Sequence, residues 1–262
     1  PAAGKEISVS LNYVESTEKA SEPLFKGFIT AISPNFQSDG IFSITIEGYD
    51  HSYRLQKIYT KSSFDKIDDY SKIVRTLASN AGIGIGIVDL TGTIPKTSIS
   101  IDSEQSDYLF IRKLAERYGY YFYVRNNKIY FLNPAGIPSK PIDLKWGSDI
   151  TSFHPRMSAS QVVTSVTVFG PSQERSKESV TGKATIDDIR SNEPEKKSGA
   201  KRLSSGRLGP VDVRIHSYQA SSNSEAAAIA KGIMYQANSS FIEGECQCIG
   251  NPAIRACSDV KI

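Results

Sequence analysis

The spacing of apolar residues changes from alternate positions to every third or fourth position and back again, which restricts the fold to sheets combined with a few helices. Near the start of the chain, residues 24–32 and 41–49 are predicted to form strands. The first stretch ends at Pro34, and the second follows the Asp39-Gly40 turn. The clearest alternation comes earlier still, at Ile7, Val9, Leu11 and Tyr13.

Two helices are predicted in the middle of the chain. The helical period over residues 67–81 follows acidic side chains and stops at Gly82. The period over residues 106–118 begins at the capping residues Ser106 and Asp107 and closes at Gly119.

A hairpin follows the second helix. Residues 120–125 and 128–132 are rich in aromatic and β-branched side chains, and Asn126-Asn127 joins them with residues that tolerate a left-handed turn. Helices and hairpin together predict a compact α/β unit inserted after the first strands, over residues 61–140.

The last part of the chain returns to strands. Residues 162–169 predict a strand covered on both faces, and residues 211–215 and 241–249 predict two more. A helix is expected over residues 224–238, where Ser222 and Glu225 have capping-box spacing.

Residues 171–210 break this pattern, and we expect a long polar loop there. Residues 171–209 contain 9 basic and 6 acidic side chains, which leaves 22 of each sign elsewhere. The whole formal charge of +3 therefore lies in this segment, and such a small excess argues against a general binder of nucleic acid.

No metal site or catalytic group is predicted. The three histidines are far apart and outside any metal-ligand or nucleophile motif, so we expect them in plain surface or core roles. The three cysteines lack the fourth ligand that structural zinc requires. These candidates are His51, His154, His216, Cys246, Cys248 and Cys257.

Two further motifs are rejected on their context. Gly82, Gly84 and Gly86 follow a helix and lead into a strand, whereas a phosphate-binding loop follows a strand and opens a helix. Residues 117–124 contain an aromatic cluster like that of an RNA-recognition strand, but they end a helix, so hairpin packing is the better interpretation. No apolar stretch has the roughly 20 residues that a membrane span needs.

Several stretches, taken in order, resemble the baseplate hub family that includes the phage late control gene D protein and the VgrG proteins of type VI secretion. A weaker match covers residues 166–171 with Gly182-Lys183-Ala184. The stronger matching stretches are residues 24–30, 48–50, 105–120, 122–124 and 129–131.

This resemblance implies an α+β, β-rich fold of two β-barrels, over residues 1–60 and 141–262, with the α/β unit inserted between them. It also implies a structural homotrimer that docks the tail tube and contacts spike and baseplate proteins, as part of a virion or injection particle assembled in the bacterial cytoplasm. No catalytic residue, cofactor, nucleic acid or direct membrane insertion is expected. The chain starts at Pro1 and stops inside a strand-like run, so we expect a fragment of a longer protein.

Two rival functions stay open. A cell-wall-degrading enzyme would need paired carboxylates at a cleft, and the spacing of acidic residues indicates no such pair. A carbohydrate- or peptide-binding β-domain would have no need to form a trimer, so the oligomeric state separates it from a hub.

Overall fold

The computed structural model describes residues 2–11, 22–38, 40, 42–59, 61–134, 141–170, 180–188, 209–216 and 220–262. Its helices are α1 (Tyr53–Gln56), α2 (Tyr70–Asn80), α3 (Asp107–Tyr118), the 3-10 turn η2 (Ile186–Asp188) and α5 (Asn223–Ser239). Its strands are β1 (Glu6–Val9), β2 (Phe25–Phe36), β3 (Phe42–Asp50), β4 (Ser62–Ile67), β5 (Gly84–Val88), β6 (Thr97–Ile101), β7 (Tyr121–Arg125), β8 (Lys128–Leu132), β9 (Ile142–Asp143), β10 (Ile150–Met157), β11 (Ser165–Phe169), β12 (Thr181–Thr185), β13 (Asp212–His216), β14 (Ile242–Cys248) and β15 (Val260–Lys261).

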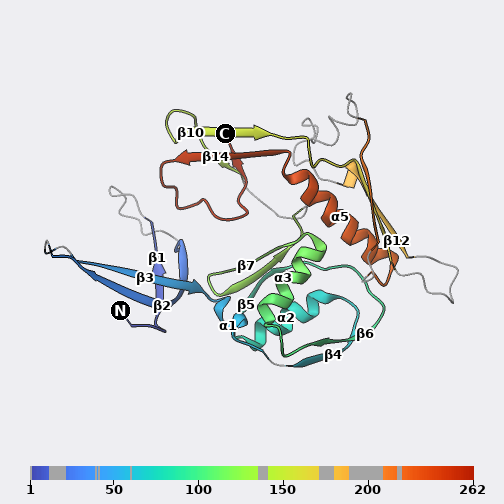
Figure 1. Cartoon of the computed structure of the whole chain (residues 1–262), viewed down its shortest axis with the longest axis horizontal. Helices are drawn as coiled ribbons and strands as arrows, with labels where there is room; N and C mark the ends of the chain where they lie inside the picture. Colours follow the sequence, from blue (N-terminus) through green and yellow to red (C-terminus); the bar gives the residue numbers. More distant parts are fainter. Residues whose placement is uncertain are drawn as a thin grey trace.

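The strands form small separate sheets (Figure 1). Three of these sheets are entirely antiparallel: β1-β2-β3, β10-β14 and β4-β6. The other sheets contain parallel pairs: β5 beside β8, β13 beside β11, and β15 beside β9. The β-rich α+β class is confirmed, but no sheet among the described residues closes on itself, so the expected two-barrel architecture is not found there.

The α/β unit forms as its local signals predict. Ser106 Oγ accepts a hydrogen bond from Leu109 N (3.3 Å) at the start of α3, and Gly119 closes the helix with a φ of 65°. Asn126 and Asn127 both have positive φ, at 49° and 57°, in the turn between β7 and β8. This left-handed pair matches the twist of the two strands, which confirms the predicted hairpin.

Helix α5 ties the end of the chain to this unit. Its N-cap Ser222 accepts a hydrogen bond from Glu225 N (3.0 Å), as the capping-box spacing predicts. A Cβ atom at Gly232 would lie 2.1 Å from Tyr118 O, so only glycine allows α5 to approach α3 this closely. One hydrophobic core therefore runs from α2 and α3 into the sheet of β11, across the boundary expected near residue 140.

A buried ionic cluster reinforces this contact. The Glu225 side chain is fully buried and pairs with Arg117, while Tyr118 Oη donates a hydrogen bond to Glu225 Oε1 (2.8 Å). Ser221 donates to the other carboxylate oxygen from its backbone nitrogen (2.8 Å) and its hydroxyl (2.7 Å). Burial and the neighbouring Glu225 raise the pKa of Tyr118, so its hydroxyl remains a donor at all ordinary pH values.

The helix expected over residues 67–81 is shorter than predicted. It starts at Tyr70, capped by Asp69, which accepts a hydrogen bond from Ser71 N (2.8 Å). Ile67 belongs instead to β4, whose pairing with β6 the sequence analysis missed. The pairing partner at residues 97–101 is distant in sequence, so no local period could indicate it.

Two expectations about strands also need correction. β2 continues past Pro34, because β1 pairs only as far as Phe28 and one edge of β2 has no described strand beside Pro34. Within the expected loop over residues 171–210, β12 pairs antiparallel with β11. Its inward face is made of Gly182 and Ala184, which give no apolar signal; the rest of the loop, apart from residues 180–188, 209 and 210, lies outside the described residues.

Candidate assembly surfaces

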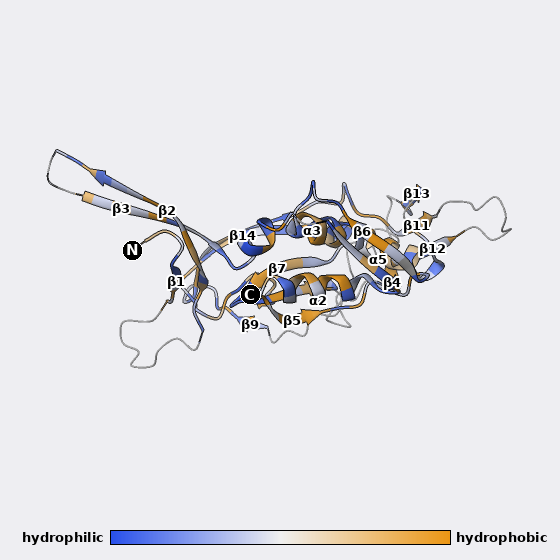
Figure 2. Cartoon of the chain, turned by 90° about the horizontal axis from the view of Figure 1, so that it is seen from below, coloured by the Kyte–Doolittle hydropathy of each residue, from blue (hydrophilic) through white to orange (hydrophobic). Residues whose placement is uncertain are grey.

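The outer part of the β2-β3 hairpin extends away from the body of the protein (Figure 2). We call residues 31–36 of β2 and 42–47 of β3 the arm. β1 covers only the opposite end of β2, so the described residues of the arm form a two-stranded ribbon. A two-stranded ribbon is at best marginally stable in water without a further layer or strand.

The arm has one apolar side. Residues directly opposite each other in an antiparallel pair lie on the same side of the ribbon. Phe36 is 79% exposed and Phe42 is 68% exposed, so these two rings alone leave on the order of 300 Å² of apolar area in water. We call this side the arm face; it consists of the cross-strand pairs Ile32 with Ile46, Pro34 with Ile44 and Phe36 with Phe42.

The other side of the arm is mainly polar. It carries the pairs Ser33 with Thr45 and Asn35 with Ser43. A ribbon with one apolar and one polar side is the usual pattern of a strand pair whose apolar side packs on a second layer. The described residues supply no such layer for the arm face.

The base of the arm is held to the body by polar contacts. His51 is buried, and its Nε2 atom donates a hydrogen bond to Glu6 Oε1 (3.0 Å). Lys26 Nζ lies 3.4 Å from the same oxygen. These two partners, His51 first, hold the pKa of Glu6 below its ordinary value. Arg54 lies over the ring of Phe28, 5.0 Å from its centroid, and completes the anchor.

A second ribbon of the same kind is formed by β10 and β14. Its apolar side includes Met157 and Ile242, which face each other and are 62% and 57% exposed. We call this side the ribbon face; its pairs are Phe153 with Cys246, Pro155 with Gly244 and Met157 with Ile242. The opposite side pairs His154 with Glu245 and Arg156 with Glu243, so this ribbon too is apolar on one side only.

The arm and the β10-β14 ribbon project from different parts of the body and do not cover one another (Figures 1 and 2). Exposed apolar patches of a few hundred Å² usually mark interaction sites on a protein surface. The chemistry that this arrangement supports is therefore association through apolar sheet faces, with backbone edges available for strand pairing.

The residues considered as chemical candidates lie apart. His51 is buried at the base of the arm, His154 is exposed on β10, and His216 stacks on Phe169 at the end of β13, with ring centroids 5.2 Å apart. Cys246, Cys248 and Cys257 are free thiols. Within the described ranges, no three His, Cys, Asp or Glu side chains gather as a metal site would require.

The two rejected motifs have structural roles. Gly82 has a φ of 67° after α2, and Gly84 and Gly86 belong to β5. Arg117 pairs with Glu225 at the end of α3, and the aromatic residues after it belong to the hairpin. The sequence predicted the β3 strand of the arm but only the first two residues of its β2 strand, because Pro34 was expected to end that strand. It did not predict the exposed face, because alternation alone does not tell which side of a ribbon is covered.

Comparisons with known proteins show a family for this chain and one solved structure of similar fold. The family model described as the Alg8 N-terminal domain matches residues 2–262; that description names a domain and states no activity. No curated protein matches the chain. The 43 kDa tail protein of prophage MuSo2 from Shewanella oneidensis is similar in structure, with a TM-score of 0.59 and 13% identity over 94% of this chain and 73% of that one. At these levels the likeness concerns the fold.

Two further structures are more distant. The tail protein from Neisseria meningitidis MC58 has a TM-score of 0.49 and 12% identity, covering 82% of this chain and 60% of that one. Prophage tail protein gp18 from Listeria monocytogenes EGD-e has a TM-score of 0.43 and 12% identity, covering 83% of this chain and 63% of that one. No helix in the described ranges combines the length and the apolar character needed to cross a membrane.

Proposed function

We propose that this chain, which belongs to the Alg8 N-terminal domain family and has the fold of a prophage tail protein, is a structural component of a phage tail or of a related contractile injection particle. Its activity is assembly, and no residue acts as a catalyst. The observation that carries the proposal is the arm, whose apolar face lies outside the described core.

Within this role we propose a hub that forms a homotrimer and docks the tail tube. The support is the presence of two different uncovered faces on one chain, the arm face and the ribbon face. Contacts between unlike surfaces of identical subunits are heterologous, and they produce a closed ring when the rotation between neighbours allows it. The order of the stretches that resemble hub proteins supports the same architecture, with spike and baseplate proteins as further partners.

The proposed setting follows from this role. The hub is assembled in the bacterial cytoplasm and becomes part of a virion or of an injection particle. It binds neither nucleic acid nor a bilayer by itself.

The test is the mass of the protein in solution, measured by light scattering over a range of concentrations. We expect a trimer that dissociates on dilution, and we expect Phe42→Ser to shift it toward monomer. The matched control is Ser43→Ala on the polar side of the same strand, which should leave the mass unchanged. A monomer at all concentrations, for both this chain and the full-length protein, would contradict the hub proposal.

A second measurement separates the enzyme alternative. Purified cell wall is incubated with the protein, and soluble products are quantified. The hub proposal predicts no turnover, together with loss of incorporation into particles for the Phe42→Ser variant of the full-length protein. Hydrolysis that one Glu→Gln substitution abolishes, with mass and stability unchanged, would establish the enzyme instead.

A further inference from the structure

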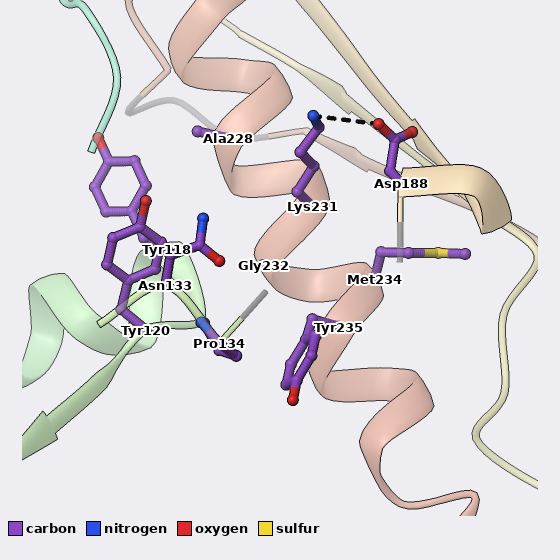
Figure 3. A pocket seen from close by; sticks show the side chains of 10 residues that line it. All are labelled: Tyr118, Tyr120, Asn133, Pro134, Asp188, Ala228, Lys231, Gly232, Met234 and Tyr235. Carbon is purple, nitrogen blue, oxygen red and sulfur yellow. Dashed lines mark ion pairs between the residues drawn. The ribbon is translucent and has the colours of Figure 1, made fainter. Parts of the chain in front are cut away.

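A small pocket lies where α5 passes the end of α3 and the end of β8, and none of its lining residues belongs to the arm face or the ribbon face (Figure 3). Its volume is about 100 Å³. Tyr118 and Tyr120 stand on one side of Gly232, and Tyr235 lies about one turn further along α5. Ala228 and Gly232 lie one helical turn apart on the side that α5 contributes. Gly232 packs directly on the backbone of Tyr118, and the small side chain of Ala228 leaves the pocket open.

The aromatic walls are held in place by hydrogen bonds. Tyr118 Oη donates to Glu225 Oε1 (2.8 Å), and Tyr120 Oη donates to Leu90 O (2.6 Å). Burial raises the pKa of Tyr120 to about 12, so its ring stays neutral. Tyrosines fixed in this way need little further ordering when a ligand binds, which reduces the entropic cost of binding.

The rim of the pocket is polar but carries no net charge. Lys231 Nζ lies 3.2 Å from Asp188 Oδ1, and both side chains are partly exposed. A hydrogen bond from Thr185 N (2.8 Å) and the ion pair with Lys231 lower the pKa of Asp188, so the carboxylate is ionised at neutral pH. An ammonium and a carboxylate side by side offer donors and acceptors to hydroxyl groups without attracting a charged ligand.

We propose that this pocket binds a neutral N-acetylated amino sugar. The cavity is smaller than the roughly 150 Å³ that admits benzene, and its volume is enough for a group of the size of an acetamido methyl beside Tyr120 and Tyr235, above the fully buried Tyr118. The C–H face of the pyranose packs on Tyr235, and Asp188 and Lys231 bind its hydroxyl groups. Paired charges at the rim disfavour phosphates and nucleic acid, which require unpaired cations.

This site is independent of the proposed assembly role. The experiment titrates the protein with a trimer of N-acetylglucosamine, followed by isothermal calorimetry and by protein NMR. Cellotriose, which has the same linkage but a hydroxyl in place of the acetamido group, is the matched ligand control. We expect saturable binding of the acetylated trimer, at least about 10-fold tighter than cellotriose.

Variants locate the binding. Ala228→Leu fills the pocket with a good helix former and should abolish binding. Tyr235→Ala should weaken binding about 10-fold or more. Tyr235→Phe is its control: both variants lose the hydrogen bond to Tyr121, but Tyr235→Phe keeps the ring and should bind as the parent does. Lys231→Met should weaken binding, and Lys183→Met, an exposed lysine on β12, should not.

The outcomes are distinct. Absence of saturable binding, equal affinity for cellotriose, or binding that Ala228→Leu leaves intact would each overturn the proposal. Thermal unfolding of every variant shows that it is folded. Light scattering of the same samples measures assembly separately. A negative sugar-binding result would therefore not change the conclusion about the trimer, and a monomeric protein would not change the conclusion about sugar binding.

Discussion

The α/β unit and the arm contain the same kinds of apolar residue, but the unit buries them and the arm exposes them. In the α/β unit, Ile73, Ile111 and Ile129 are fully buried, and α2, α3, α5 and the hairpin share one core. In the arm, Phe36 and Phe42 remain mostly in water. Burial inside the chain stabilises the folded monomer, whereas an exposed apolar face can gain its free energy only on association. Stability and assembly therefore depend on separate parts of this molecule.

The largest effect on stability is expected at the buried carboxylate that joins the two halves of the core. Glu225→Gln removes the negative charge that pairs with Arg117 in a largely buried position. Removing one member of a buried ion pair costs about 3 to 5 kcal/mol of unfolding free energy. Chemical denaturation measures this loss, and Glu116→Gln on the exposed face of α3 is the control. Equal small losses for both variants would mean that the cluster does not hold the halves together.

The second largest effect on the unfolding free energy is expected in the core of the α/β unit. Leu114 is buried on α3 against the rest of the core, and Leu114→Ala should lower the unfolding free energy by about 2 to 5 kcal/mol through lost contacts and the cavity left behind. Denaturant titration gives the value directly. A cost under roughly 0.5 kcal/mol would place this residue with the surface positions, contrary to the structure.

The third effect is a dependence of the unfolding free energy on pH, caused by Asp107 at the start of α3. Asp107 is 2% exposed, its Oδ1 atom has no hydrogen-bond partner among the described residues, and burial raises its pKa to about 6. Because the folded state binds this proton more tightly than the unfolded chain, the stability it contributes is present below about pH 4 and is lost as the pH rises through about 6.

Asp107→Asn removes this dependence, so the variant should gain about 2 kcal/mol over the parent between pH 4 and pH 7. The measurement is the difference between the two unfolding free energies at each pH, which cancels the titration of other groups. A difference that does not change with pH would show that the carboxyl titrates normally.

The smallest effect on stability is expected in the arm. Phe42→Ser should change the unfolding free energy of the monomer by less than roughly 0.5 kcal/mol, because the ring has few contacts to lose. The same change should cause the loss of assembly described above. Denaturation under dilute, monomeric conditions isolates the first quantity. A cost of several kcal/mol there would show that the arm face is covered by the chain itself.

Local signals in the sequence predicted the three long helices, α2, α3 and α5, and the hairpin, but not the short α1 or η2. Ser106, Gly119 and the Asn126-Asn127 pair act on neighbouring backbone atoms, so their effects can be inferred without the tertiary structure. The same holds for Ser222 at the start of α5. Helix α2 differs from the prediction mainly in its first turn, because Ile67 belongs to β4 and pairs with the distant strand β6.

Features that depend on distant partners could not be predicted in this way. β12 buries Gly182 and Ala184 against α5, and small residues leave no hydrophobic pattern. The arm face and the ribbon face have the alternation of any half-buried strand pair, so the sequence cannot tell that they are uncovered. The pocket is lined by Ala228 and by three tyrosines from separate parts of the chain, and no spacing along the sequence links them.

The close crossing of Gly119 and Gly232 has a consequence for the order in which the protein matures during synthesis. Tyr118 and Glu225 are separated by 107 positions, so the ribosome must complete α5 before the α/β unit can bury Arg117 and close its core. Until then, the nascent chain presents an unfinished apolar surface. A protein cut after residue 140 would therefore expose the part of the core that α5 covers, and apolar surface left open in this way favours aggregation.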